Sequence, residues 1–344
     1  MARFKKTSDI RMGVIGYGGA FNMGKRHFSE ARGAGITPVA VADVDKSRLK
    51  VAEQDFPGIQ TFDSPARMLE GSEVNLVVLI TPHNTHAKLA LQCLRAGCHV
   101  ISEKPLAITT AECDAMMREA KKRRLVLSTY HNRHWDGCIL EAVKHIHKEK
   151  VIGDVYRVEA HMGSYGLPGD WWRTSKTISG GILYDWGVHL LEYSLQIIDS
   201  DIVEVSGYAK TGFWAPKTAW KKDTNEDEAA AVVRFSNGTW LTLNMTSLDQ
   251  NPKKGNLEIT GTKGTYIFDG RTYEIIQRKG NRRVITSGEN TASRSEEFYR
   301  NIADHLSKGT KLVITPEWSR RPIHILDLAC RSAKLGRAIR AKHK

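Results

Sequence analysis

The residues with the types and spacing for acid–base chemistry are a lysine, an aspartate and a histidine. Asp185 and His189 lie four positions apart, so on a helix their side chains share one face, one turn apart. There the carboxylate can orient the imidazole and stabilise its charged form. Lys104 comes two residues after the run 99–102, and partial burial would suit its amine to proton transfer or to polarising a hydroxyl. We expect these three residues to be catalytic.

The alternative for Asp185 and His189 is an ion pair on a helix surface. The same spacing also suits a metal ion, but no third ligand lies close in sequence, so no metal site is predicted.

A glycine-rich turn lies between an apolar run at residues 10–15 and a helical pattern at residues 24–34. In that context glycines let the backbone approach a pyrophosphate at a helix N-terminus. The spacing departs from G-x-G-x-x-G, because position 21 is Phe and the next glycine is Gly24. A purely structural turn is therefore the alternative. The candidate cofactor contacts in this turn are Gly16, Gly18, Gly19, Ala20 and Phe21.

Asp43 ends a second apolar run, residues 36–41, after the glycine turn. A carboxylate at this place accepts hydrogen bonds from the adenosine ribose hydroxyls of a dinucleotide and repels a 2′-phosphate. The pattern therefore favours NAD over NADP as the cofactor. The alternative is that Asp43 caps the next helix.

Polar residues also follow two later apolar runs. Pro82, Asn84 and His86 come after residues 74–80, and Glu103 with Lys104 comes after residues 99–102. Parallel strands bind ligands at their carboxyl ends, so we expect these residues to contact the cofactor, with ordinary polar loops as the alternative.

A glycine-bearing loop upstream of Asp185 carries aromatic side chains and one guanidinium. This combination suits a hydroxylated, sugar-like ligand, although tryptophans serve as often in packing. The candidate substrate contacts of this region are Tyr165, Trp172 and Arg173, together with Asp185 and His189.

The order of predicted elements indicates an α/β chain of two domains. In residues 1–130 apolar runs alternate with helical patterns, which predicts a doubly wound parallel sheet. In residues 131–344 we expect helices at about 138–148, 181–198, 296–306 and 316–341. Several strands, with a hairpin turn at Asn237–Gly238, predict a mainly antiparallel sheet there. The last helix is the candidate to pack back on the first domain.

The composition is typical of a globular protein, with 344 residues, of which 41% are hydrophobic and 26% charged. No run approaches the roughly 20 apolar residues of a membrane helix, and the start has no secretion segment, so we expect a cytoplasmic protein without a membrane partner. The five cysteines form no C-x-x-C pair. The net charge of +13 is scattered without a recognition motif, so we expect no nucleic-acid partner.

Taken together and in order, these motifs resemble those of the Gfo/Idh/MocA oxidoreductase family across nearly the whole chain. The resemblance implies an N-terminal Rossmann domain that binds NAD or NADP. It also implies a C-terminal α/β domain whose open, mainly antiparallel sheet serves oligomerisation, so a homodimer or homotetramer is expected. The motifs that carry it are Gly16 to Ala20, Asp43, Pro82 with Asn84 and His86, Glu103-Lys104-Pro105, and Asp185-x-Gly187-x-His189.

The resemblance also implies roles for single residues. Lys104 matches the lysine near the reacting hydroxyl, His189 the acid/base, and Asp185 its partner. Asn132 and Arg133 resemble the stretch after the sixth strand that lines the active-site cleft. We therefore assign Asn132 to the substrate and Arg133 to the cofactor.

The function predicted in this way is hydride transfer between a secondary alcohol of a sugar, polyol or glycoside and NAD, with His189 and Lys104 handling the proton. Two alternatives are an NAD-dependent glycoside hydrolase that oxidises its sugar transiently and a non-catalytic NAD-binding regulator. The chain departs from the family in its longer glycine turn, which leaves the phosphate contacts open. The loop with Trp172 and Arg173 belongs to the variable region that decides the substrate.

Overall fold

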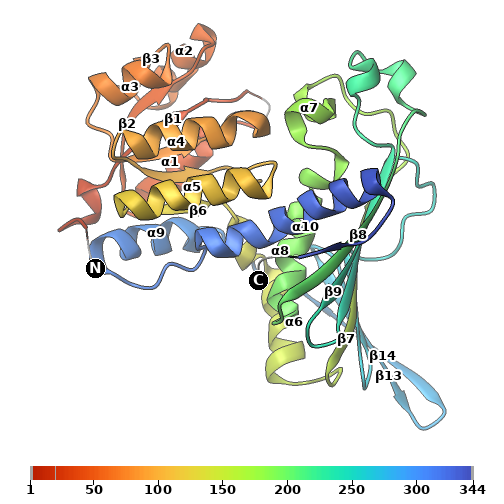
Figure 1. Cartoon of the computed structure of the whole chain (residues 1–344). Helices are drawn as coiled ribbons and strands as arrows, with labels where there is room; N and C mark the ends of the chain where they lie inside the picture. The colour runs from red at the N-terminus through yellow and green to blue at the C-terminus, as the bar shows by residue number, and fades with distance from the viewer. Residues whose placement is uncertain (1–2, 20, 342–344) are drawn as a thin grey trace. The chain divides into compact units, whose positions relative to one another are not determined.

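The structure is a computed structural model that describes residues 3–19 and 21–341, and it divides into two compact units (Figure 1). The first unit contains the described residues up to Asn132 and the later segment Glu296–Arg320. The second contains Arg133–Ser295 and the described residues from Arg321 onward. Each unit has its own sheet.

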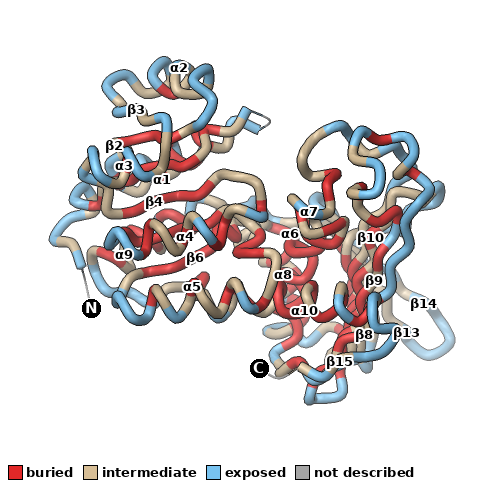
Figure 2. Tube along the Cα trace, turned by 45° about the horizontal axis from the view of Figure 1, so that its top comes forward, coloured by how far each residue is buried: buried red, intermediate tan, exposed pale blue. Residues whose placement is uncertain are grey.

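Six parallel strands form the sheet of the first unit, in the order β3-β2-β1-β4-β5-β6. This order confirms the predicted doubly wound parallel sheet. β4 is buried along its whole length, which explains why its sequence shows no polar alternation (Figure 2). The strands are β1 (Arg11–Ile15), β2 (Thr37–Ala42), β3 (Gln60–Phe62), β4 (Leu76–Leu79), β5 (His99–Ser102) and β6 (Leu127–Thr129).

The helices of this unit follow the strands in turn. α4 packs beside α5 and against β4 and β5, whereas α1 packs against β2, α2 and α9 (Figure 1). Their bounds are α1 (Met23–Gly33), α2 (Lys46–Asp55), α3 (Pro65–Gly71), α4 (His86–Arg95), α5 (Thr110–Arg123) and α9 (Glu297–Lys308).

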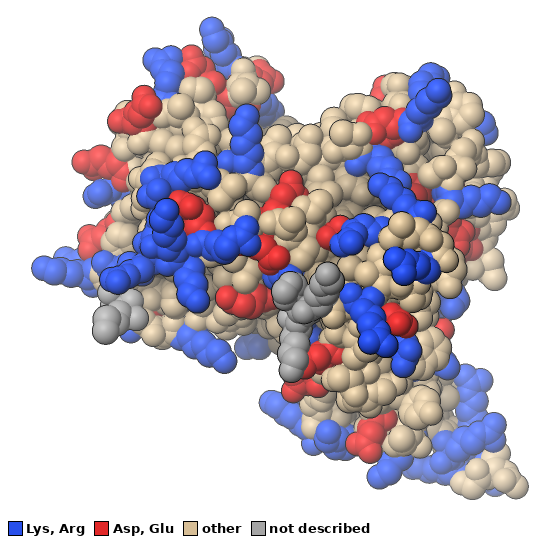
Figure 3. Space-filling view, viewed as in Figure 1, with Lys and Arg blue, Asp and Glu red and all other residues tan. Residues whose placement is uncertain are grey.

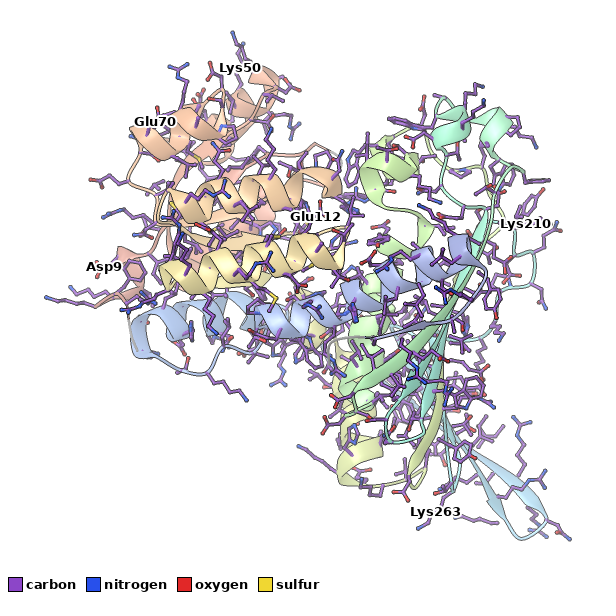
Figure 4. The ribbon with its side chains drawn as sticks, in the orientation of Figure 1. Asp9, Lys50, Glu70, Glu112, Lys210 and Lys263 are labelled. Atoms are coloured by element: carbon purple, nitrogen blue, oxygen red, sulfur yellow. The ribbon has the colours of Figure 1, made fainter. Side chains whose placement is uncertain are left out.

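Local sequence signals set several helix ends. Thr109 accepts a hydrogen bond from the Glu112 N–H, and the Glu112 carboxylate accepts the Thr109 N–H in return, at the start of α5 (Figure 4). Ser64 caps α3 ahead of Pro65. After α4, Gly97 takes a φ of +89°, which favours glycine. Short-range sequence signals therefore set the starts of α3 and α5 and the end of α4.

The segment Glu296–Arg320 completes the first unit from the far end of the sequence. The N–H groups of Arg3 and Phe4 donate to the Leu306 carbonyl at 2.6 and 3.1 Å. The Ser128 hydroxyl at β6 donates to the Ile314 carbonyl at 2.8 Å. These bonds tie α9 and the chain after it to the parallel sheet.

The second unit contains a nine-stranded sheet in the order β14-β13-β12-β11-β7-β10-β9-β8-β15. Every described pair is antiparallel except β7 with β10, which confirms a mainly antiparallel sheet. The strands are β7 (Val155–Gly163), β8 (Ile202–Lys210), β9 (Glu228–Phe235), β10 (Trp240–Thr246), β11 (Leu257–Gly261), β12 (Thr265–Phe268), β13 (Thr272–Lys279), β14 (Arg282–Glu289) and β15 (Ile339–Arg340).

Burial alternates along the central strands of this sheet, so one face carries the core. α8 (Gly187–Ile197) packs on β7 and β10, and α6 (Gly137–Val143) packs on β12. α7 is a single turn, Lys176–Ser179, and α10 spans Pro316–Leu335. The predicted turn at Asn237–Gly238 joins β9 to β10, with Gly238 at a φ of +86°.

Two sequence expectations for the second unit need correction. The helix predicted over 181–198 begins only at Gly187, because Gly181 takes a φ of +125° and the Glu226 carboxylate accepts the Ile182 N–H. The helix predicted over 316–341 ends at Leu335, because Gly336 adopts a φ of +65° and the chain then pairs with β8 as β15. The helix predicted over about 138–148 is present as α6 and the π-helical turn Lys144–Lys148 that continues it.

The β13–β14 hairpin has no counterpart in the sequence expectations. Its residues are mostly exposed, and Lys and Arg side chains gather on it at the lower right of Figure 3. Arg278 lies opposite Arg283, and Lys279 lies opposite Arg282.

Among the described residues, none of the helices combines the length and hydropathy that crossing a bilayer requires.

Gly207 provides a test of how closely β8 packs on α10. An added Cβ would come 1.9 Å from the carbonyl oxygen of Ala329. We expect Gly207→Ala to lower the free energy of unfolding by about 1–3 kcal/mol, because strand and helix must move apart. Thermal unfolding followed by circular dichroism measures the change. In the control Gly270→Ala nothing lies within 4 Å of the added Cβ, and equal melting temperatures of the two variants would contradict the packing argument.

Candidate active site

The glycine turn follows β1 and leaves no room for a side chain at its first position. Gly16 has a φ of +86°, and a Cβ there would lie 2.3 Å from the carbonyl oxygen of Ile80. At Gly18, by contrast, no atom of the described residues beyond its chain neighbours lies within 4 Å of an added Cβ. Phe21 is 59% exposed, and Ala20 lies outside the described residues. Within the described part of the chain, the Asn22 side chain does not cap the N-terminus of α1.

Asp43 shapes this turn from the end of β2. Its Oδ2 accepts the Tyr17 N–H at 2.6 Å, and its Oδ1 accepts the Asp45 N–H at 2.9 Å. The residue that caps α2 is Asp45, which accepts the Ser47 N–H at 2.8 Å. Asp43 is therefore part of the turn and not the helix cap.

Arg48 is a residue of this region that the sequence reasoning missed. Its Nη2 donates to the Tyr17 carbonyl at 3.2 Å, and its Nη1 lies 3.1 Å from the position of a Cβ added at Gly19. The guanidinium thus lies against the glycine turn. The available signal was a cation in the first turn of the helix that follows Asp43.

The loop after β4 is held by the buried side chain of His86. Its Nδ1 lies 2.8 Å from the Pro105 carbonyl oxygen and its Nε2 lies 2.8 Å from the Thr81 carbonyl oxygen. These two contacts join the loops that follow β4 and β5. Pro82 is half-buried at the start of this loop and Asn84 is exposed.

Glu103 and Lys104 follow β5. Glu103 Oε2 accepts the Lys104 N–H at 3.0 Å, and its Oε1 lies 3.1 Å from Nε2 of the buried His27. Burial disfavours the ionised carboxylate, but the His27 hydrogen bond and the nearby positive charge outweigh it and lower the pKa of Glu103. Lys104 is half-buried, and its peptide bond to Pro105 is cis.

In the second unit, Asp185 forms an ion pair with Arg173. Arg173 Nε lies 3.4 Å from Asp185 Oδ1. The guanidinium also stacks over the rings of Trp171 and Trp172, at 4.8 and 4.4 Å from their centroids. Two candidate substrate residues, Trp172 and Arg173, are thereby brought together with Asp185. The pairing of Asp185 with His189 stays a prediction.

His189 lies in the first turn of α8 and is 5% exposed. Its ring packs edge-on against Trp186, with 5.5 Å between centroids. The Arg133 guanidinium lies over the same indole at 4.7 Å and donates to Asp136 Oδ2 at 2.9 Å. The Trp186 indole therefore contacts both His189, the predicted acid/base, and Arg133. The sequence reasoning missed Trp186.

Two polar residues ahead of β9, the half-buried Asn225 and the buried Glu226, hold the loops around Asp185. Glu226 accepts the Ile182 N–H at 3.1 Å and pairs with the Lys176 amine at 2.7 Å. The Asn225 amide donates to the Arg173 carbonyl at 2.6 Å. The sequence reasoning missed both, because their partners lie more than 40 positions away in the chain.

The remaining two candidate residues lie apart from these contacts. Tyr165 is 50% exposed, and its ring packs on Trp214 with 5.5 Å between centroids. Asn132 is the last residue of the first unit's main segment and is half-buried.

Comparison with known proteins gives two successive family matches. The oxidoreductase family with an NAD-binding Rossmann fold matches residues 10–131. The GFO/IDH/MocA C-terminal domain matches residues 140–267.

Similar proteins cover almost the whole chain. The scyllo-inositol 2-dehydrogenase (NADP(+)) of Bacillus subtilis is 24% identical, over 98% of each protein. The myo-inositol 2-dehydrogenase of Thermotoga maritima is 27% identical, over 79% of this chain and 80% of that protein. The crystal structure of an NAD-binding protein from Listeria innocua has 26% identity and a TM-score of 0.82, over 97% of each chain.

The two family matches fall on successive parts of the chain and belong to one family, which confirms the resemblance seen in the motifs. This chain is a member of the Gfo/Idh/MocA oxidoreductase family, with an NAD-binding Rossmann domain at its N-terminal end.

Proposed function

We propose that this chain is an NAD-dependent dehydrogenase of a secondary alcohol in a sugar, polyol or glycoside. The observation that carries the proposal is the presence of Lys104 two residues after the end of β5 and of His189 in the first turn of α8. Two relatives of this chain are inositol dehydrogenases, which supports a cyclic polyol or sugar as the substrate class.

The glycine turn fits a dinucleotide. Among the described residues, Gly18 leaves open space where a phosphate could approach the backbone, and the Asn22 side chain does not cap the start of α1. Gly16, Gly18, Gly19 and Asp43 would hold the cofactor, which when bound supplies the acceptor for the hydride removed from the alcohol carbon.

In this proposal His189 removes the proton of the substrate hydroxyl. Its burial against Trp186 limits access of water to the ring. Lys104 polarises the same hydroxyl by donating a hydrogen bond to its oxygen. Asp185 acts as partner of His189, and its ion pair with Arg173 is consistent with an ionised carboxylate.

NAD is the proposed cofactor because Asp43 places a carboxylate at the end of β2. Arg48 is the feature that favours NADP, because a guanidinium beside the turn can pair with a 2′-phosphate.

We also propose that the chain forms a homodimer or homotetramer. Light scattering on the purified protein measures the oligomeric state.

A substrate panel tests the proposed function. The absorbance of the reduced nicotinamide is followed while the protein meets NAD, then NADP, with polyols, free sugars, glycosides and sugar acids, and each mixture is assayed for bond cleavage. NADH accumulation with one alcohol supports the dehydrogenase. Glycoside cleavage without NADH accumulation would replace it with the hydrolase. Binding of NAD with neither reaction would support a non-catalytic, NAD-binding regulator.

Gly18→Ala tests whether the open space at the turn belongs to the cofactor. We expect the melting temperature of the protein without cofactor to stay unchanged, because the added Cβ meets no atom within 4 Å. The affinity for NADH should fall about tenfold or more, equivalent to about 1.4 kcal/mol, because the Cβ occupies space near the phosphates. Fluorescence titration measures this affinity. Gly33→Ala in α1 is the control that should change neither, and wild-type affinity in Gly18→Ala would contradict the assignment.

Asp43→Asn tests the cofactor preference. The variant keeps an acceptor for the Tyr17 N–H but loses the charge that repels a 2′-phosphate. The ratio of kcat/KM for NAD to that for NADP should fall about tenfold or more, the effect of losing about 1.4 kcal/mol of repulsion. Asp45→Asn removes a neighbouring charge and serves as the control. An equal change of this ratio in both variants would show that the preference for NAD comes from the total negative charge near the turn and not from Asp43.

His189→Ala tests the proton acceptor. Loss of a general base lowers turnover by about 10²–10⁴-fold, so we expect a fall of kcat in that range. The dissociation constant for NADH should stay within error of the wild type. Steady-state kinetics and a NADH titration on the same preparation measure both. Wild-type turnover in this variant would remove His189 from the mechanism.

A further inference from the structure

The contacts behind Lys104 form a chain of hydrogen bonds that reaches the C-terminal segment of the first unit. The Lys104 N–H donates to Glu103 Oε2 at 3.0 Å. The other oxygen, Glu103 Oε1, lies 3.1 Å from His27 Nε2. On its far side, His27 Nδ1 lies 2.6 Å from the hydroxyl of Tyr299 in α9.

This arrangement can fix the proton on one nitrogen of His27. A tyrosine hydroxyl that donates to Nδ1 leaves that nitrogen as an acceptor, so the ring N–H is on Nε2 and points at the carboxylate. His27 and Tyr299 are both fully buried, so water does not compete for these contacts. The ring of Tyr130 packs 4.2 Å from the ring of His27 and restricts its rotation.

We propose that Tyr299 and His27 are positioning residues for Lys104, acting through Glu103. Tyr299 sets the tautomer of His27, His27 holds one oxygen of Glu103, and the other oxygen of Glu103 holds the backbone of Lys104. The amine of Lys104 is thereby presented from a fixed point after β5. The inference rests on the proposed function in one respect, because it takes Lys104 to act on the substrate hydroxyl.

The charge of Glu103 depends on the same contacts. The groups around it are His27 from α1, Lys104 beside it, and Tyr299 and Tyr130 beyond His27, with Glu30 bonded to the Tyr130 hydroxyl at 2.5 Å. The His27 hydrogen bond helps to lower the pKa of Glu103. Weakening that bond should let Glu103 take up a proton at a higher pH, which removes the acceptor charge beside Lys104.

A matched pair of variants separates positioning from packing. Tyr299→Phe removes the hydroxyl that faces His27, and Tyr130→Phe removes the hydroxyl that faces Glu30 in the same buried cluster. Both tyrosines are at most 1% exposed, so the two variants should lose similar stability. The proposal expects only Tyr299→Phe to affect Lys104.

The first measurement needs neither cofactor nor substrate. Hydrogen–deuterium exchange read by mass spectrometry on a peptide covering Glu103–Leu106 reports the Lys104 amide. Exchange in Tyr299→Phe should be about tenfold faster than in the wild type, the effect of about 1.4 kcal/mol lost from the hydrogen-bond chain. His27→Leu should exchange faster still, and His27→Gln, whose amide N–H can donate to Glu103, should recover part of the protection. Equal exchange in Tyr299→Phe and Tyr130→Phe would overturn the proposal.

The second measurement uses the substrate that the panel identifies. In Tyr299→Phe kcat should fall by about tenfold, and activity should be lost on acidification at a higher pH than in the wild type. Tyr130→Phe should keep the wild-type pH profile, and an unmoved profile in Tyr299→Phe would overturn the proposal. A wild-type protein without turnover on any substrate would overturn the proposed function alone, since the exchange experiment still decides whether His27 and Tyr299 position Lys104.

Discussion

The first unit depends on the close contact between β1 and β4 where the two strands end. Ile15 and Leu79 are paired in the ladder, so the chain after each strand meets the other at once. The Ile80 N–H donates to the Ile15 carbonyl at 2.8 Å, and the Ile80 carbonyl leaves no space for a side chain at position 16. On the other side of β1, β2 delivers Asp43 to the Tyr17 N–H. The sheet itself therefore builds the turn in which a dinucleotide can lie.

In the second unit, polar groups just ahead of β9 hold the loops around Arg173 and Ile182. Asn225 and Glu226 bind the backbone at Arg173 and Ile182. The next residue, Asp227, accepts the N–H groups of Phe213 and Trp214 at 2.8 and 3.0 Å. These bonds reach main-chain atoms, and loop side chains add ion pairs, Lys176 with Glu226 and Arg173 with Asp185. The loop around Asp185 is therefore held by both its backbone and its side chains.

Sequence reasoning succeeded where the cause of a structure is local. The capping box at Thr109 and the buried run of β4 could be predicted because their signals lie within a few residues. It failed where the cause lies far away in the chain. The break before α8 depends on Glu226, 44 positions from Ile182, and the Tyr299 contact with His27 joins residues 272 positions apart. The β13–β14 hairpin escaped notice because its exposed strands bury little more than Ile275 and so show no clear alternation.

The location of the excess positive charge in the structure bears on whether the substrate is an anion. Four cations face one another in pairs at the tip of the β13–β14 hairpin, a placement that is destabilising and that dissolved salt screens. The carboxylates of the candidate site, in contrast, are matched: Asp43 and Glu103 hold backbone N–H groups, and Asp185 holds Arg173. Part of the net charge of +13 therefore resides on an exposed hairpin, and the total is not by itself evidence that the substrate is an anion.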